Sequence, residues 1–281
     1  MPQLNITPLE AQTECLSLVI EIGDMPVRVN TSSPEFARVL SERYSGFAAP
    51  AARYARSGAE VEFYIELSEG RFSAPDAPVR VTQSAGHWRM TRGDFRAEWD
   101  PRMRRGTIRQ SANPYSIDAV LRIVHTLALA RQGGMLLHAA SAIRNGKAFV
   151  FAGVSGAGKT TISRLAPSDV TLLTDEISYV RKSGDGYIAF GTPFTGELAK
   201  LGENVSAPLA AVYFLEQGPA NRIESVPAGD AIRSLLANVL FFAEEPELVR
   251  QVFQSACELV ERIAVARLTF MPDSRVWEMI Q

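Results

Sequence analysis

Residues 153–160 read GVSGAGKT and are the most informative stretch of the chain. They match the pattern G-x-x-x-x-G-K-[ST] at every fixed position, follow the apolar stretch 147–153 and precede a helix predicted over 159–165. Glycines let successive backbone N–H groups face a triphosphate, and the start of a helix adds positive potential. The pattern therefore predicts a phosphate-binding loop between a strand and a helix.

The side chains of this loop have distinct predicted roles. We expect the Lys159 amine to reach the β and γ phosphates of ATP and the Thr160 hydroxyl to coordinate Mg²⁺. The nucleotide-binding residues are then predicted to be Gly153, Ser155, Gly156, Ala157, Gly158, Lys159, Thr160 and Thr161.

An acidic pair follows the loop along the chain. Asp175 and Glu176 lie at the end of the apolar run 170–173, sixteen and seventeen residues after Lys159, within a strand predicted over 171–180. One carboxylate could hold Mg²⁺ while the other takes a proton from an acceptor hydroxyl. Neighbouring strand residues project to opposite faces, so both can serve only if the chain turns there. The predicted metal ligands are Thr160, Asp175 and Glu176, and a solvated strand end is the alternative.

A histidine stands in the strand before the loop. Stretches 135–143 and 147–153 flank Asn145-Gly146, which favours a hairpin with a type I′ turn. Counting back through the turn places His138 opposite Gly153, at the mouth of the loop. A lone histidine in an apolar strand is also compatible with a purely structural role. With that alternative open, the predicted catalytic residues are His138, Lys159 and Asp175.

The rest of the pattern predicts an α/β fold in two parts. Residues 1–112 alternate like the strands of a twisted antiparallel sheet, with a helix inserted within 33–47, and form a mainly β (α+β) domain. A helix starting at Asn113-Pro114 and ending at Gly133-Gly134 links it to an α/β domain with a mixed sheet, over 113–281. Further predicted strands are 186–191, 209–217 and 265–270, and further predicted helices are 228–242, 245–262 and a short one around Trp277.

Composition excludes several classes of protein. The 281 residues are 46% hydrophobic with a formal net charge of −2, which is globular and lacks the basic excess of a nucleic-acid binder. No window resembles a membrane span and the start lacks a signal-peptide pattern, so we expect a cytoplasmic protein with no membrane partner. Two distant cysteines indicate no disulfide framework. The arginines within 89–109 could contact an acidic partner, but their interleaved acids favour a solvated sheet face.

The order of His138, the loop from Gly153 and the acids from Asp175 resembles the C-terminal catalytic domain of bacterial HPr kinase/phosphorylase, whose nucleotide site is similar to that of phosphoenolpyruvate carboxykinase. The resemblance is best over 130–215 and implies that Asp175 is the general base, assisted by His138, with Glu176 and Thr160 as metal ligands. The family carries Asp where this chain has Glu176. Its later glycine-rich signature is replaced here by GTPFTGE at 191–197.

The motifs and the resemblance together predict an ATP- and Mg²⁺-dependent kinase for a hydroxyl on a protein, peptide or small molecule. A homo-oligomer is compatible with this prediction. An ATP-binding regulatory or assembly module without phosphotransfer is the main alternative, and a mechanical ATPase is a third. The stretch 191–197 is either a plain turn or a substrate-side loop in which Glu197 contacts metal or acceptor. Replacing His138 with alanine should impair phosphotransfer only under the kinase hypothesis.

Overall fold

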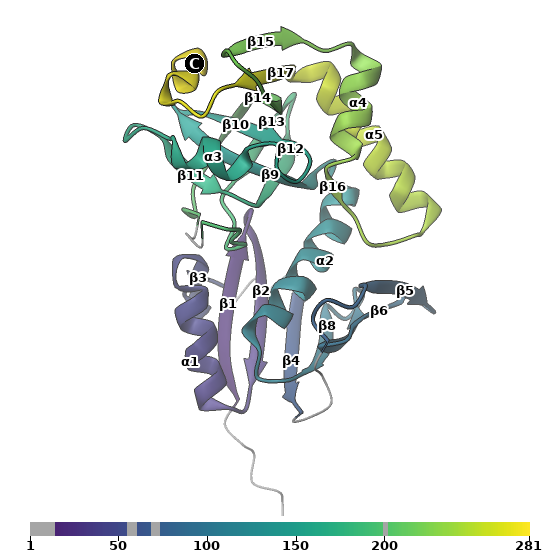
Figure 1. Ribbon diagram of the computed structural model, residues 1–281. Helices are drawn as coiled ribbons and strands as arrows, with labels where there is room; N and C mark the ends of the chain where they lie inside the picture. Colours follow the sequence, from purple (N-terminus) through teal and green to yellow (C-terminus); the bar gives the residue numbers. More distant parts are fainter. Residues whose placement is uncertain (1–14, 55–60, 69–73, 199–201) are drawn as a thin grey trace, which may run out of the picture.

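The computed structural model describes residues 15–54, 61–68, 74–198 and 202–281. Within these ranges the chain has an α/β fold with two mixed sheets, one in each half, joined by the long helix α2 (Pro114–Gln132) (Figure 1). The start of the chain, where the sequence lacks a signal-peptide pattern, lies outside the described residues. None of the described helices is both long and apolar enough to cross a bilayer.

The N-terminal sheet is mixed, so the prediction of an antiparallel sheet was wrong. Its described strands lie in the order β3-β1-β2-β4-β8-β7-β6-β5, and β4 pairs in parallel with both β2 and β8. Helix α1 (Pro34–Arg43), capped by the Ser33 side chain, lies between β2 and β4 in sequence. A helical crossover of this kind lets two strands run parallel. The strands are β1 (Leu16–Ile22), β2 (Met25–Thr31), β3 (Ala48–Ala49), β4 (Val61–Leu67), β5 (Arg80–Ser84), β6 (His87–Arg92), β7 (Phe95–Asp100) and β8 (Arg105–Gln110).

The C-terminal sheet contains the strand that leads into the phosphate-loop motif. In the described residues its path is β10-β9-β12-β13-β14-β17-β15, and β10 also pairs in parallel with β14, so five of these strands form a closed circuit. Short strands β11 and β16 pair with β9. The strands are β9 (Met135–Arg144), β10 (Lys147–Ala152), β11 (Thr171–Thr174), β12 (Ile177–Ser183), β13 (Gly186–Phe190), β14 (Ser206–Gln217), β15 (Arg222–Ser225), β16 (Val239–Leu240) and β17 (Ala264–Phe270).

Two predicted elements are divided in the structure. The strand predicted over 171–180 breaks into β11 and β12, and the helix predicted over 228–242 ends at Leu236 before β16. The remaining described helices, including three 3₁₀ turns, are α3 (Lys159–Arg164), α4 (Ala228–Leu236), α5 (Pro246–Arg262), η1 (Ser45–Phe47), η2 (Ala51–Tyr54) and η3 (Ser274–Met279).

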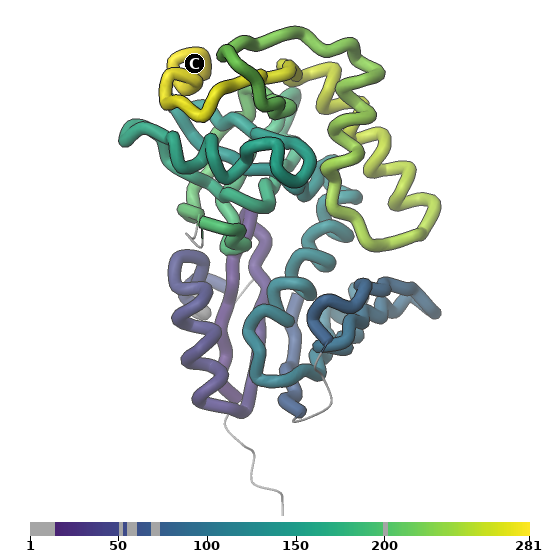
Figure 2. The backbone as a smooth tube through the Cα atoms, in the orientation of Figure 1, coloured from purple at the N-terminus to yellow at the C-terminus, as the bar shows by residue number. Residues whose placement is uncertain are grey.

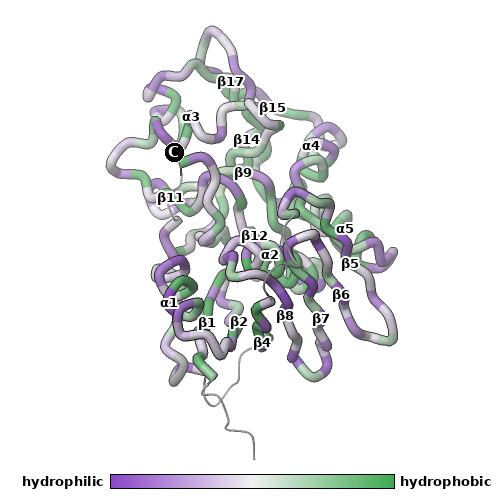
Figure 3. Tube along the Cα trace, turned by 60° about the horizontal axis from the view of Figure 1, so that its bottom comes forward, coloured by the Kyte–Doolittle hydropathy of each residue, from purple (hydrophilic) through white to green (hydrophobic). Residues whose placement is uncertain are grey.

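Helix α2 connects the two sheets, as the tube in Figure 2 shows. The Asn113 side chain caps its start and Gly133, in the left-handed conformation, ends it, as the sequence predicts. The helix is buried over most of its length, and one apolar cluster continues from the N-terminal strands through α2 to Leu136 and Tyr179. Figure 3 shows hydrophobic segments gathering around this helix. A domain boundary near residue 112 stays a prediction.

His125 on α2 is a buried titratable group away from the phosphate-loop motif. Its ring lies edge-on to Tyr179 with 5.5 Å between centroids, and neither ring nitrogen has a hydrogen-bond partner among the described residues. Burial lowers the pKa of His125 from 6.5 to about 3. The imidazole is therefore neutral in the folded protein at every mildly acidic pH.

This burial predicts an acid-sensitive fold. Between pH 3 and 6.5 the unfolded chain binds a proton at His125 that the folded chain does not, so stability rises with pH across this window. Urea unfolding at pH 7 and pH 5 should show a loss of about 2 kcal/mol attributable to this site. A His125→Leu variant of similar volume should lack that part of the loss. An equal pH slope in both proteins would contradict the assignment.

Candidate functional site

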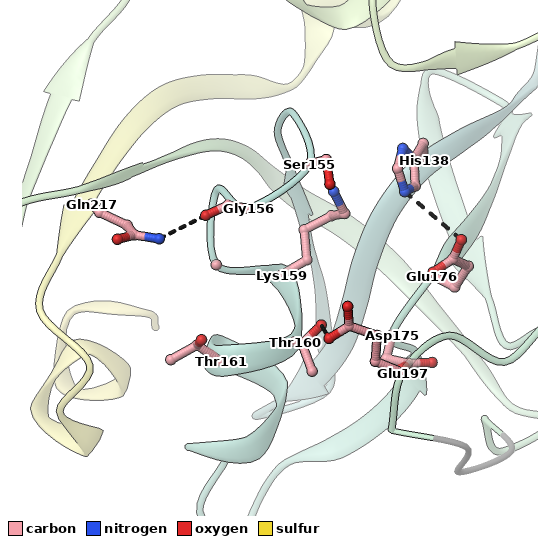
Figure 4. A pocket seen from close by; sticks show the side chains of 11 residues that line it. His138, Ser155, Gly156, Lys159, Thr160, Thr161, Asp175, Glu176, Glu197 and Gln217 are labelled. Atoms are coloured by element: carbon pink, nitrogen blue, oxygen red, sulfur yellow. Dashed lines mark hydrogen bonds and ion pairs between the residues drawn. The ribbon is translucent and has the colours of Figure 1, made fainter.

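A cavity of about 460 Å³ opens where the strand-loop-helix unit meets the acidic pair (Figure 4). It brings His138, the loop and the acids 175 and 176 together, as the sequence predicts. It also includes Glu197 and Gln217, from two further segments of the C-terminal half. The residues that line it are His138, Ser155, Gly156, Gly158, Lys159, Thr160, Thr161, Asp175, Glu176, Glu197 and Gln217.

The β9–β10 hairpin places His138 at the mouth of the loop. Asn145 and Gly146 both have positive φ, 51° and 73°, as a type I′ turn requires. Ala152 pairs with Ala139, which confirms the predicted register of His138 opposite the start of the loop. The His138 backbone N–H donates to the Asn238 carbonyl at 2.7 Å. The histidine is thus fixed by main-chain bonds on its strand.

The loop itself depends on glycine at its last turn. Gly158 has φ +111°, and a Cβ there would come within 2.6 Å of the Phe270 ring, so an L-side chain is excluded by both conformation and space. Helix α3 begins immediately afterwards at Lys159. The glycine therefore lets the loop pack on β17 while turning into the helix.

Lys159 is buried and held by its own loop. Its Nζ donates to the carbonyls of Gly153 at 2.8 Å and Val154 at 3.3 Å. Only 8% of the residue is exposed, and burial lowers the pKa of Lys159 while Glu176 and Glu197 oppose the shift. Ammonium bonds to neutral carbonyls leave the positive charge without a direct ion-pair partner among the described residues. The amine can therefore exchange these carbonyls for phosphate oxygens.

The chain turns at the acidic pair, so both carboxylates face the cavity. Asp175 is 4% exposed, and its two oxygens accept backbone N–H groups of Gly196 at 2.9 Å and Leu198 at 3.0 Å. A Cβ on Gly196 would lie 2.5 Å from a Glu176 oxygen, so glycine lets this loop approach the acids without displacing the Glu176 side chain. The stretch 191–198 is thus bound against the acids and does not form an isolated turn.

Two glutamates of the cavity have different neighbours. The Thr160 hydroxyl lies 3.4 Å from a Glu197 oxygen, whereas the His138 Nε2 lies 3.8 Å from a Glu176 oxygen (Figure 4). Hydroxyl and carboxylate oxygens are the hard donors that Mg²⁺ prefers. In the ranges that the structure covers, no group of three or more His, Cys, Asp or Glu side chains is arranged to hold a metal by itself. Thr160 and Glu197 place a hydroxyl and a carboxylate oxygen side by side in the cavity.

His138 is electrostatically biased toward its neutral form. Burial and then the positive charge of Lys159 lower the pKa of His138, Arg122 adds to the lowering, and Glu176 opposes it. At neutral pH the imidazole therefore retains one nitrogen able to accept a proton.

Two residues that the sequence analysis missed support the loop. Gln217, at the end of β14, donates to the Gly156 carbonyl at 2.6 Å, and the Asn238 side-chain oxygen accepts the Gly153 N–H at 3.2 Å. Because β14 runs parallel to β10, their carboxyl ends meet at one edge of the sheet. That rule could have identified Gln217. Asn238 follows α4 in a tertiary position that no local pattern indicates.

A second cavity of about 390 Å³ adjoins the first. The two share Gly158, Thr161 and Gln217, and the second continues to Gly218, Phe270 and Pro272. The two spaces therefore meet along one side of the loop, away from His138 and the acids.

Comparisons with known proteins identify a family. A family model described as "SynChlorMet cassette protein ScmC" matches residues 107–281, and no curated protein matches the sequence. Among solved structures, the chain is similar to the Hpr(Ser) kinase/phosphatase from Coxiella burnetii, at 12% identity and a TM-score of 0.25, over 43% of this chain and 88% of that chain. Since the family model spans well over half of the sequence, the chain belongs to the ScmC family.

Proposed function

We propose that this protein is an ATP- and Mg²⁺-dependent phosphotransferase that phosphorylates a hydroxyl group of a protein, a peptide or a small molecule. The observation that carries the proposal is the meeting of Lys159, Asp175 and His138 in one cavity beside the loop of 153–160. Phosphoryl transfer needs positive charge at the phosphates and a group that accepts the proton of the attacking hydroxyl. This cavity contains both.

The roles follow from position and chemistry. Lys159 binds the phosphates once its amine leaves the Gly153 and Val154 carbonyls. Asp175 accepts the proton of the acceptor hydroxyl, and the backbone bonds from Gly196 and Leu198 fix the direction of its carboxylate. His138, whose Nε2 lies 3.8 Å from a Glu176 oxygen, would assist on the same side in its neutral form. Positioning and charge stabilisation would then supply most of the rate.

Thr160 and Glu197 would hold the magnesium ion that accompanies the nucleotide, with Asp175 and Glu176 as the further acids of the site. The ion would supply charge neutralisation at the phosphate oxygens. The approach of Glu197 to Thr160 favours it over Glu176 as the carboxylate ligand.

The second cavity would receive the nucleoside. The residue after the Lys-Thr pair, Thr161, lies where the two cavities meet, so a triphosphate in the first cavity has room to continue into the second. This direction leaves His138 and the acids at the γ-phosphate end, where the acceptor must bind.

Transfer itself is tested by a search for the product. A lysate incubated with the protein and γ-¹⁸O-labelled ATP should yield, by mass spectrometry, a labelled phosphohydroxyl group that is absent when the Lys159→Ala variant replaces the wild type. Nucleotide binding without any labelled product and without ADP release would refute the kinase proposal.

His138 should affect the rate and its pH dependence. A His138→Gln variant should release ADP on the order of 100-fold more slowly, with the MgATP dissociation constant unchanged within about twofold. Because the pKa of His138 is lowered, the wild-type rate should fall only as the pH drops below about 6.5. The variant should lack this acidic limb. A histidine with a purely structural role would leave the pH profile unaltered in the variant.

An ATP-sensing module without phosphotransfer is the second candidate, and one observation favours it. Lys159 and Asp175 are both engaged by main-chain groups in this conformation, and the loop that holds Asp175 carries Phe194, buried against α2 residues. If a nucleotide released these bonds, the resulting movement of the loop would therefore be transmitted through Phe194 to the helix that joins both halves. Binding with no turnover would favour this candidate.

A further inference from the structure

Arg122, on helix α2, differs from every other partly buried arginine of the residues that the structure describes. Of the five others, four each donate to an aspartate carboxylate and Arg28 donates to the Ser17 hydroxyl, whereas Arg122 has no ion pair or hydrogen bond among the described residues. Its Nε is fully buried without a partner, while the residue as a whole stays partly exposed. The four paired arginines are Arg43, Arg92, Arg144 and Arg181.

The nearest carboxylate on the same helix already has other hydrogen-bond partners. Asp118, one turn before Arg122, accepts from the Arg43 guanidinium and from the Tyr44 hydroxyl. Burial is the largest influence on Arg122 and lowers its pKa, with Asp118 and Glu176 in opposition. A guanidinium stays charged even so. A mostly buried cation with no direct counter-ion costs folding free energy. Binding of an anion by the guanidinium would offset that cost.

The surroundings of Arg122 connect it to the candidate site. Its guanidinium lies over the Phe194 ring at 4.9 Å, and Phe194 belongs to the loop whose backbone binds Asp175. Arg122 is also close enough to Glu176 and His138 to act on both electrostatically. It does not line the main cavity, in which the triphosphate would lie. An anion at Arg122 would therefore be a second one, next to the acids.

We propose that Arg122 binds an oxyanion of the acceptor, a carboxylate or a phosphate, beside the acidic pair. The inference rests on the proposed kinase function, because only then is a second substrate present. A planar guanidinium with free N–H donors matches either anion in a bidentate geometry. The ring of Phe194 holds the guanidinium plane in position. The substrate class is thereby narrowed to hydroxyl compounds that carry a negative charge.

The test uses the full chain saturated with Mg²⁺ and a non-hydrolysable ATP analogue, so that the phosphate loop is filled. Inorganic phosphate and acetate are then titrated in separate arms, with chloride at equal ionic strength as the screening control. NMR follows the Arg122 Nε–Hε resonance and the Phe194 amide. We expect both to shift with phosphate or acetate and not with chloride, and the tighter anion indicates which group the acceptor carries.

Variants provide the second readout. Arg122→Gln should weaken anion binding, read at the Phe194 amide, by about 10-fold or more, and Arg122→Lys should weaken it less. The matched control is Arg131→Gln, an exposed arginine on the same helix, which should change nothing. If Arg122→Gln does not fold, the wild-type resonances and Arg122→Lys still decide.

The possible outcomes distinguish a failure of the proposed kinase function from a failure of anion binding at Arg122. Failure of the ATP analogue to bind would contradict the proposed function. If the analogue binds but neither anion shifts Arg122, or if Arg122→Gln binds anions as wild type does, this inference alone is overturned.

Discussion

Replacing Lys159 with alanine should abolish most of the affinity for MgATP. The amine is the buried cation of the cavity, and its loss removes charge-assisted hydrogen bonds to the phosphates. We expect the dissociation constant, measured by isothermal titration calorimetry, to rise on the order of 100-fold. ADP release at saturating ATP should fall further, because developing charge on the transferred group loses the same partner.

The matched control for this change is Lys147→Ala. Lys147 is exposed at the start of β10, on the same strand that leads into the loop. It should bind MgATP as the wild type does. Affinity in Lys159→Ala within about twofold of wild type, in a variant with a wild-type melting temperature, would place the triphosphate elsewhere.

Replacing Asp175 should stop transfer while sparing nucleotide binding. The carboxylate is the buried base candidate, and loss of a general base costs about 10²–10⁴-fold in rate. We expect Asp175→Ala to bind the ATP analogue with near wild-type affinity and to release ADP at least about 100-fold more slowly. Stopped-flow binding and steady-state ADP release on the same preparation measure the two quantities.

The asparagine variant gives a finer result. Both Asp175 oxygens accept backbone N–H groups, so the amide of Asp175→Asn must point an NH₂ donor at either Gly196 or Leu198. Two facing donors cost about 1–3 kcal/mol, so this variant should lose stability as well as rate. Asp185→Asn, in the exposed turn between β12 and β13, is the control. Full activity in both Asp175 variants would remove Asp175 from the chemistry.

The sequence predicted the local geometry of the site because the signals there are local. A two-residue Asn145-Gly146 turn fixes the hairpin register, and the register alone places His138 opposite the start of the loop. The position of the acids at a turn, by contrast, depends on the Thr174 side chain and on the backbone of 196–198, which lie apart in sequence. The pattern of 171–180 predicts one continuous strand. In the structure its two halves, β11 and β12, both pair with β9 on either side of the turn.

The local sequence pattern could not predict how the strands pair or which buried charge lacks a partner. Alternation in 17–30 and 61–67 indicates strands but does not specify whether neighbours run parallel, and the helix within 33–47 was the only hint of the β2–β4 crossover. Arg122 lies among apolar residues with a helical period, so it reads as one polar position of an amphipathic helix. Its significance depends on Asp118 being occupied by Arg43, a contact between distant segments.

A structure of the protein with Mg²⁺ and a non-hydrolysable ATP analogue is the most direct test of the central claim. We predict the triphosphate along residues 153–160, the Lys159 amine moved from the Gly153 carbonyl to the phosphates, and the nucleoside beside Gln217 and Gly218. An analogue bound at another surface, with Lys159 still on its own loop, would contradict the account.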